Sequence, residues 1–209
     1  MDIKSKIKEK DITNLAQELI RIPSDEIAGE QEVCEYLSDI LKSLGMKVRL
    51  QEVLPKRPNI IAEVLGGNNG KSIMFNGHID TVPIGNIEKW NTDPYKAIIK
   101  DSKLFGRGAT DMKGSIASMI IAIKYIMNNV ENFNGKIIFT GVMAEETTGL
   151  GTQKVLEENI KIGEIYEVPV QMIVLLNEIF KKISKIKSFI LIIDYIKKET
   201  YGSTIKRIK

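Results

Sequence analysis

An α/β fold, with helices layered on a β-sheet, is the fold class that the sequence predicts, on three observations. Segments with apolar residues at helical spacing recur along the chain. Short apolar runs typical of buried strands lie between them. The chain has 209 residues and 43% of them are hydrophobic, which is enough to bury the core of one ordinary domain.

The first two predicted elements are helices. One runs through "ITNLAQELIRI" after Asp11, its expected N-cap, and ends before Pro23. The second is expected from Gly29 to Leu44, where apolar residues form one stripe. Gly45 then stands in the position that stops a helix.

Strands and further helices follow these two helices. Three strand-like runs come first: "MKVRLQEV", "NIIAEVLG" and "SIMFNG". After a loop with Trp90 and Pro94, the remaining expected elements are a hairpin in "KAIIKDSKLFGRG", a long helix from about Met112 to Met127, a strand in "KIIFTGVM" and a helix after Gly149.

Charge and hydropathy exclude several classes of protein. The net charge is only +3 and no long run of like charges occurs, so we expect no nucleic-acid partner. No stretch approaches the ~20 apolar residues of a membrane span, and no signal peptide is visible, so we expect no membrane partner and a cytoplasmic location. Cys34 has no second cysteine to pair with and is expected to be an inert thiol.

Polar clusters follow three of the predicted strands or hairpins. His78 and Asp80 follow "SIMFNG", Asp111 follows "KLFGRGAT", and Glu145 and Glu146 follow "KIIFTGVMA". His78 is the only histidine in the chain. Because ligands bind at the carboxyl ends of strands in open α/β sheets, the three clusters could converge on one site.

Taken singly, each cluster also has an ordinary structural explanation. His78 with Asp80 fits a polar pair bonded within the fold, and Asp111 fits a helix N-cap. Glu145 with Glu146 fits a solvated pair that opens a helix. The apolar run before this pair argues against that explanation, because it would carry two carboxylates into a partly buried place. A bound metal ion would offset that cost.

Other common catalytic motifs do not fit. In "GRGATDMKGS" the dinucleotide-binding pattern needs glycine where Asp111 stands. The Walker A pattern needs Gly-Lys where Lys113 and Gly114 stand in the opposite order. No Gly-x-Ser-x-Gly elbow occurs, and a Ser-His-Asp triad has only generic support.

Four motifs in order make the resemblance to a known family specific. These are "FNGHIDTVP", Trp90 with "DPY" shortly after it, "LFGRGATDMKG" and "AEETTGLG". Together they resemble the family of acetylornithine deacetylases, succinyl-diaminopimelate desuccinylases and carboxypeptidase G, over roughly residues 10 to 160. The resemblance implies an incomplete zinc-exopeptidase-like catalytic domain, with a mixed sheet and helices on both faces. It also implies a metal-dependent hydrolase that cleaves a small N-acyl amino acid or a short peptide, in some members for amino-acid biosynthesis.

The resemblance also assigns roles to single residues. His78 would bind one of two Zn²⁺ or Co²⁺ ions, Asp111 would bridge them, and Glu146 would bind the other. Asp80 would orient the imidazole of His78, and Glu145 would be the general base. Imidazole and carboxylate groups suit Zn²⁺, which lowers the pKa of a bound water to near neutrality. A cis peptide bond between Asp111 and Met112 is a further implication.

The chain departs from the family pattern after residue 160. The family site needs another carboxylate and a second histidine, but neither Glu164 nor Glu167 lies in the expected context and no second histidine exists. Three ligands suffice for one Zn²⁺ with water, so we expect at most one tightly bound ion. Family members are often homodimers, but the oligomerisation domain that they insert is missing here.

A change of composition accompanies this departure. Residues 1–160 carry a net charge of −2, whereas residues 161–209 are rich in isoleucine and carry a net charge of +5. We therefore expect residues 1–160 to be the N-terminal part of the catalytic domain. Residues 161–209 would be a divergent basic tail produced by truncation or a frame shift, or else a natural C-terminus that forms an amphipathic helix.

Three functional hypotheses stay open. The chain is the N-terminal part of a metal-dependent deacylase or metallopeptidase, or a catalytically inactive remnant that keeps the fold and at most weak metal binding. The third hypothesis is an interaction module whose basic tail binds a partner.

Overall fold

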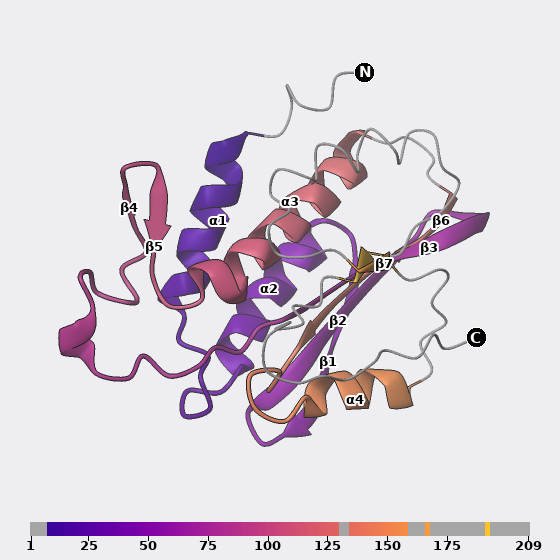
Figure 1. Ribbon diagram of the computed structural model, residues 1–209. Coiled ribbons are helices and arrows are strands. Elements are labelled where there is room, and N and C mark those ends of the chain that lie inside the picture. The colour runs from indigo at the N-terminus through magenta and orange to yellow at the C-terminus, as the bar shows by residue number, and fades with distance from the viewer. Residues whose placement is uncertain (1–7, 130–133, 159–165, 168–190, 193–209) are drawn as a thin grey trace.

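A six-stranded mixed sheet organises the fold (Figure 1). The computed structural model describes residues 8–129, 134–158, 166–167 and 191–192. Within them the strands lie in the order β1-β2-β6-β3-β8-β7. Their bounds are Lys47–Leu54 (β1), Arg57–Leu65 (β2), Gly67–His78 (β3), Asn134–Val142 (β6), Tyr166–Glu167 (β7) and Leu191–Ile192 (β8). The pairs β1–β2 and β2–β6 are antiparallel, and the pairs β6–β3, β3–β8 and β8–β7 are parallel.

Helices cover both faces of this sheet, as predicted. The bounds are Glu9–Arg21 (α1), Gln31–Ser43 (α2), Gly114–Asn129 (α3) and Leu150–Glu157 (α4). Helices α1, α2 and α3 lie on one face, where α1 packs on α3, α2 on β1 and β2, and α3 on β3. Helix α4 lies on the opposite face against β1, β2 and β6 (Figure 1).

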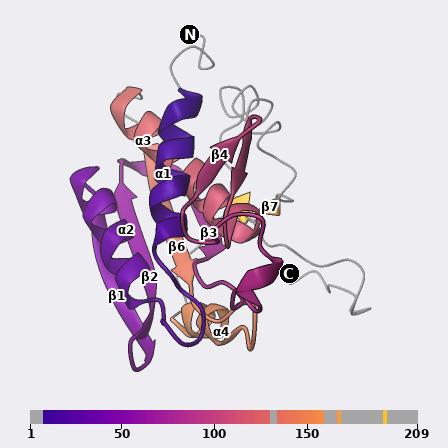
Figure 2. The same ribbon diagram turned by 90° about the vertical axis from the view of Figure 1, so that its left-hand side faces the viewer.

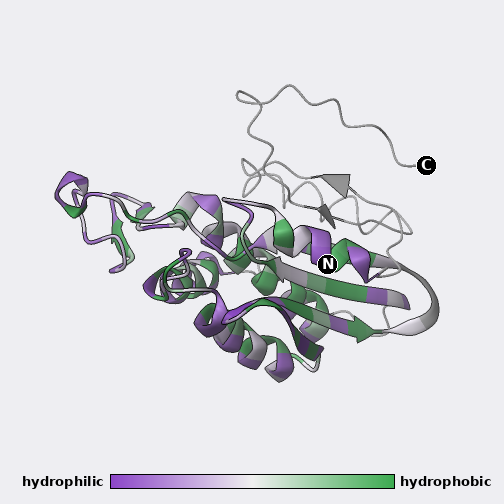
Figure 3. Cartoon of the chain, turned by 90° about the horizontal axis from the view of Figure 1, so that it is seen from below, coloured by the Kyte–Doolittle hydropathy of each residue, from purple (hydrophilic) through white to green (hydrophobic). Residues whose placement is uncertain are grey.

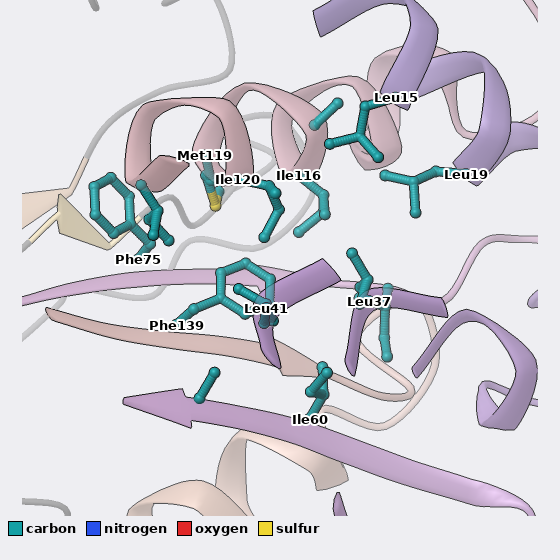
Figure 4. Packing of buried hydrophobic residues seen from close by; sticks show 14 of the residues in the cluster. Leu15, Leu19, Leu37, Leu41, Ile60, Phe75, Ile116, Met119, Ile120 and Phe139 are labelled. Atoms are coloured by element: carbon teal, nitrogen blue, oxygen red, sulfur yellow. The ribbon is translucent and has the colours of Figure 1, made fainter. Parts of the chain in front are cut away.

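The alternation of side chains along the strands explains the two layers. Phe139 of β6 points into the larger core under α1, α2 and α3, whereas its neighbour Ile138 belongs to a smaller core with Val155 of α4. Phe75 and Met74 of β3 divide in the same way. Figure 4 shows the larger core, with Leu37 and Leu41 of α2 and Ile116, Met119 and Ile120 of α3 around Phe139.

Hydropathy follows the same arrangement. The middle of the central strand β6, residues 137–139, is hydrophobic and buried, whereas the edge strand β1 alternates between exposed and half-buried residues. The helices carry both hydrophobic and hydrophilic residues (Figure 3). Because a strand covered on both faces has no solvated side, both sets of its side chains must be apolar. No helix among the described residues is long and apolar enough to cross a membrane.

A small hairpin lies beside α1 and away from the main sheet (Figures 1 and 2). It consists of β4 (Ile98–Lys100) and β5 (Lys103–Phe105), within the predicted hairpin segment. The Gln17 side chain of α1 donates a hydrogen bond to the carbonyl of Ala97, 2.7 Å away, and so attaches the hairpin to the helix. The loop that precedes the hairpin contains a short 3₁₀ helix, Ile87–Lys89.

One expectation about a helix start is wrong, and a second holds to within two residues. Lys8, not Asp11, is the N-cap of α1, and Asp11 lies in the first turn, where its negative charge still suits the positive end of the helix. The long helix α3 starts at Gly114 rather than near Met112. Asp111 and Met112 have non-helical backbone angles, so Asp111 does not cap α3 directly. The peptide bond between them is cis, as the family resemblance implies.

The predicted tail, residues 161–209, lies outside the described residues apart from β7 and β8. Cys34 is buried in α2, and burial raises the pKa of its thiol.

Candidate metal centre

The carboxyl ends of β3 and β6 meet at one edge of the sheet. His78 is the last residue of β3 and lies in register with Val142, the last residue of the parallel strand β6. Glu145 and Glu146 follow Val142 in the turn before α4, and Asp111 lies in the turn before α3. The three predicted clusters are therefore brought together, because parallel strands end at the same edge.

His78 is the centre of this group. Its side chain is 3% exposed, and its Nε2 lies 2.9 Å from Oδ1 of Asp111 and 3.8 Å from Oε2 of Glu145. Its Nδ1 lies 3.1 Å from the backbone oxygen of Asp80 and 3.5 Å from Oδ1 of that residue. Burial acts to lower the pKa of His78, but hydrogen bonds to Asp111 and Asp80 outweigh it and raise the pKa to about 10.

His78, Asp111 and Glu146 form a group of side chains that could hold a metal ion. One ligand atom from each residue lies within 4.8 Å of the other two. Ligand atoms around one tetrahedral Zn²⁺ are about 3.3–3.6 Å apart, given bonds of about 2.0–2.2 Å. Small side-chain movements would therefore allow these donors to hold one ion, and one imidazole with two carboxylates is a donor set that Zn²⁺ accepts.

Asp80 contacts more than the imidazole. Its carboxylate is buried, and it accepts hydrogen bonds from the backbone N–H of Glu145 at 3.1 Å and of Glu146 at 3.0 Å. The sequence assigned this residue only to His78. The additional contacts could not be found from the sequence, because the residues are far apart in the chain and the donors are backbone groups.

Glu145 is a half-buried carboxylate among other acidic groups. Burial raises the pKa of Glu145, and the positive charge of His78 acts in the opposite direction. The negative charges of Glu146, Asp80 and Asp111 raise the pKa further. Like charges this close together favour binding of a cation, which would stabilise all of them in the charged form.

Gly77 and Met112 pack the turn before α3 closely against the end of β3. A Cβ on Gly77 would lie 2.8 Å from Cδ1 of Ile116 and 2.8 Å from Cε of Met112, so glycine lets α3 approach β3 closely. The sulfur of Met112 accepts a hydrogen bond of 3.2 Å from the backbone N–H of His78. The residue after Asp111 thus fixes the turn against the end of β3.

Comparison with known proteins identifies the family. Residues 74–180 match peptidase family M20/M25/M40, and this region contains all five residues of the candidate centre. The chain belongs to this family.

Two curated proteins and one solved structure show how this member of the family compares with its relatives. It is 33% identical over 152 residues to a probable succinyl-diaminopimelate desuccinylase of Staphylococcus epidermidis, covering 73% of this chain and 37% of that protein. It is 50% identical over 88 residues to a succinyl-diaminopimelate desuccinylase of Buchnera aphidicola subsp. Cinara cedri, covering 42% and 23%. The crystal structure of human carnosine dipeptidase 1 matches with a TM-score of 0.63 and 27% identity, covering 71% of this chain and 35% of that one. The chain thus spans less than two fifths of the length of each of these relatives.

Arg107 and Trp90, which lie in two of the family motifs, hold the loop that follows Asp80. The guanidinium of Arg107 lies 5.0 Å from the centroid of the Trp90 ring and donates a 3.0 Å hydrogen bond to the carbonyl of Pro83. The indole N–H of Trp90 donates to the carbonyl of Ile84 at 2.8 Å. The sequence marked Trp90 as part of a motif but gave it no role.

Lys113 is a buried cation beside the centre that sequence reasoning missed. Its side chain is 2% exposed, and its Nζ donates a hydrogen bond to the carbonyl of Ile22. Burial lowers the pKa of Lys113 to about 8, although the negative charges of Asp25 and Asp80 oppose this. No signal in the sequence marks this position, because lysine is ordinarily exposed.

The structure does not describe the side chains of Glu164 and Glu167, the two acidic residues near the position of the family's further carboxylate. Glu164 lies outside the described residues, and only the backbone of Glu167, in β7, is described.

Proposed function

We propose that residues 1–160 are part of the catalytic domain of a metal-dependent amidohydrolase, either an N-acyl-amino-acid deacylase or a metallopeptidase. One observation carries the proposal: His78, Asp111 and Glu146 converge, with their ligand atoms within 4.8 Å, at the carboxyl ends of β3 and β6. Membership of peptidase family M20/M25/M40 supports the same chemistry.

Zn²⁺ or Co²⁺ is the ion that these residues would hold. His78 would bind through Nε2, and Asp111 and Glu146 would each bind through a carboxylate oxygen. When bound, such an ion polarises a carbonyl group and lowers the pKa of a bound water. The hydrogen bond between His78 and Asp111 marks the place where the ion would sit, because both atoms already face each other at 2.9 Å.

Glu145 would act as the general base. Its Oε2 lies 3.8 Å from Nε2 of His78, so its carboxylate reaches the region between the proposed ligands. From there it would take a proton from the attacking water at Oε2 and deliver it to the leaving amine nitrogen. Asp80 would hold the imidazole of His78 in the required orientation through Nδ1.

The substrate class is a small N-acyl amino acid or a short peptide, in the cytoplasm. Two matched relatives are named desuccinylases and one matched structure is a dipeptidase, which supports cleavage of an amide bond next to an amino-acid unit. Within this class N-succinyl-diaminopimelate is the first substrate to test.

A catalytically inactive remnant is the second candidate. Two observations favour it: the chain has a single histidine, and the described residues gather three ligands rather than the larger set that two ions need. We therefore propose that the chain holds at most one ion tightly.

Titration with Co²⁺, followed by its visible absorption, tests the metal site. We expect the full chain to bind one Co²⁺ per molecule and the His78→Ala variant to lose this binding. Glu146→Gln should weaken binding at least about tenfold, because losing one ligand or its support commonly costs that much.

The exposed Glu157 on α4 provides a matched control, and its Glu157→Gln variant should bind Co²⁺ as the unmodified chain does. Unchanged Co²⁺ binding in His78→Ala would overturn the assignment of the centre. Retention of two ions per molecule after dialysis would overturn the limit of one.

A further inference from the structure

Asp80 contacts both sides of the candidate centre at once. Its Oδ1 accepts the N–H of Glu145 at 3.1 Å, and its Oδ2 accepts the N–H of Glu146 at 3.0 Å. The same Oδ1 lies 3.5 Å from Nδ1 of His78. The residue is only 2% exposed, so water cannot readily replace these donors.

The backbone around Asp80 is fixed independently of these contacts. The N–H of Ile79 donates to the carbonyl of Val142 at 3.0 Å, which extends the pairing of β3 with β6. The Ser24 hydroxyl donates to the carbonyl of Ile79 at 2.8 Å, and the Ser24 carbonyl accepts the N–H of Thr81 at 3.0 Å. Asp80 is therefore held from both sides by ordered backbone.

The segment that Asp80 contacts lies in a turn with unfavourable backbone geometry. Ala144 has a φ of 53°, in the left-handed region that residues other than glycine rarely adopt. The N–H groups of Thr148 and Gly149 both donate to the carbonyl of Ala144, at 3.0 and 2.7 Å. A turn of this kind persists only where its surroundings enforce it, and Asp80 supplies two charge-assisted hydrogen bonds to it.

We infer that Asp80 is a positioning residue for the backbone of Glu145 and Glu146, and not only for the imidazole of His78. The Asp80 carboxylate thereby connects the proposed ligand His78 with the proposed base Glu145 and the proposed ligand Glu146. The relevance to catalysis rests on the proposed function, whereas the hydrogen bonds themselves do not require a metal ion. The competing explanation is that Asp80 acts on His78 alone.

Amide hydrogen exchange in the metal-free, ¹⁵N-labelled full chain distinguishes the two explanations. Asp80→Asn keeps the size of the side chain but leaves one oxygen to accept hydrogen bonds, and its NH₂ group cannot accept an N–H. We expect the amide of Glu145 or Glu146 to exchange at least about tenfold faster in this variant, because a hydrogen bond to a charged group is lost. In His78→Ala, both amides should stay as protected as in the unmodified chain.

Two controls separate this effect from general loosening. The amide of Phe139, in the middle of β6, should keep its exchange rate in both variants. Asp93 also accepts a backbone N–H, from Tyr95 at 2.9 Å, but at an exposed site, so Asp93→Asn should leave Glu145 and Glu146 unchanged. Equal protection of both amides in Asp80→Asn and the unmodified chain would overturn the inference. The inference would also be overturned if the amides of Glu145 and Glu146 exchanged as fast in His78→Ala as in Asp80→Asn.

Ser24→Ala provides a second variant in case Asp80→Asn does not fold. It removes the hydroxyl that fixes Ile79 but leaves the Asp80 carboxylate intact. We expect faster exchange at Glu145 and Glu146 with an unchanged rate at Phe139. Unchanged rates at all three amides would contradict the inference.

Co²⁺ titration of the same variants separates this inference from the proposed function. If the unmodified chain binds no Co²⁺, the proposed metal centre fails, while the exchange rates still decide the role of Asp80. If it binds Co²⁺, we expect weaker binding in Asp80→Asn and unchanged binding in Asp93→Asn. Unchanged binding in Asp80→Asn would contradict the link between the two ligands.

Discussion

Glu30 has a fully buried carboxylate that Arg57 pairs with two hydrogen bonds. The side chain of Glu30 is 0% exposed, and its oxygens lie 2.8 and 2.7 Å from Nε and Nη2 of Arg57. Hydrogen bonding to Glu30 and the charge of that residue raise the pKa of Arg57, although burial acts against them. The net contribution of such a buried ion pair to stability is small. Removing Arg57 alone is costly, because the charged carboxylate of Glu30 would then be buried without a partner.

Arg57→Met should destabilise the fold by about 3 kcal/mol or more, because it leaves the Glu30 carboxylate buried and unpaired. Urea unfolding followed by circular dichroism would measure the change in free energy. The double variant Glu30→Gln with Arg57→Met should recover part of the loss, since it removes the buried charge as well.

The exposed pair of Arg49 and Glu158 is the matched control, with side chains 46% and 33% exposed. Arg49→Met should cost less than about 1 kcal/mol, because water screens an exposed pair. Equal losses for Arg49→Met and Arg57→Met would show that burial of Glu30 does not determine the cost.

At the scale of elements, α4 approaches the sheet at a glycine. A Cβ on Gly151 would lie 2.4 Å from the carbonyl oxygen of Met143 and 2.6 Å from Oδ1 of Asn59. Asn59 is fully buried, donates to the carbonyl of Gly151 at 2.9 Å and accepts the N–H of Met143 at 2.9 Å. One side chain of β2 thus connects the start of α4 to the turn that carries Glu145.

Gly151→Ala should destabilise the fold by about 1–3 kcal/mol, because the new methyl group overlaps backbone atoms that cannot move aside as a flexible side chain could. Urea unfolding measures this, and Gln153→Ala on the exposed side of α4 should change stability by less than about 0.5 kcal/mol. A loss below that limit for Gly151→Ala would show that α4 can shift outward freely.

At the scale of the whole molecule, the number of ligands limits the activity that we expect. With Zn²⁺ or Co²⁺ added, the 209-residue chain should hydrolyse N-succinyl-diaminopimelate and N-acetylornithine negligibly. The loss should be roughly 10⁴-fold or more relative to a family member with two ions, because we expect the three described ligands to hold a single ion, and each Lewis acid lowers the barrier by several kcal/mol. Release of the free amine measures the rate.

Turnover near about 1 s⁻¹, an ordinary enzyme rate, would contradict this expectation if Glu145→Gln abolished it. Such a result would mean that the chain completes its centre with groups beyond the three ligands identified. Turnover that survives in Glu145→Gln would instead indicate a contaminating enzyme.

Much of the fold could be predicted because its signals are local. The apolar stripe of α2, with Gly45 at φ 81° after it, and the apolar runs of β2, β3 and β6 follow from residues next to one another in the chain. The N-cap of α1 is mispredicted, because Asp11 lies in the first turn and its side chain caps no helix. The start of α3 is two residues later than expected, because the turn at Asp111 is fixed by contacts with β3.

The sequence by itself determined the fold class, the family resemblance and the five candidate residues, because strand ends and the order of motifs can be recognised from residues that are close together in the chain. Only the tertiary structure decided that His78, Asp111 and Glu146 share one place, since β3 and β6 must pair in parallel before their ends can meet. It alone decided that Asp80 holds the backbone of Glu145 and Glu146, and that Lys113 is buried. Those contacts join residues far apart in the chain. Every residue except proline has a backbone N–H group, so the sequence does not indicate which of these groups Asp80 will contact.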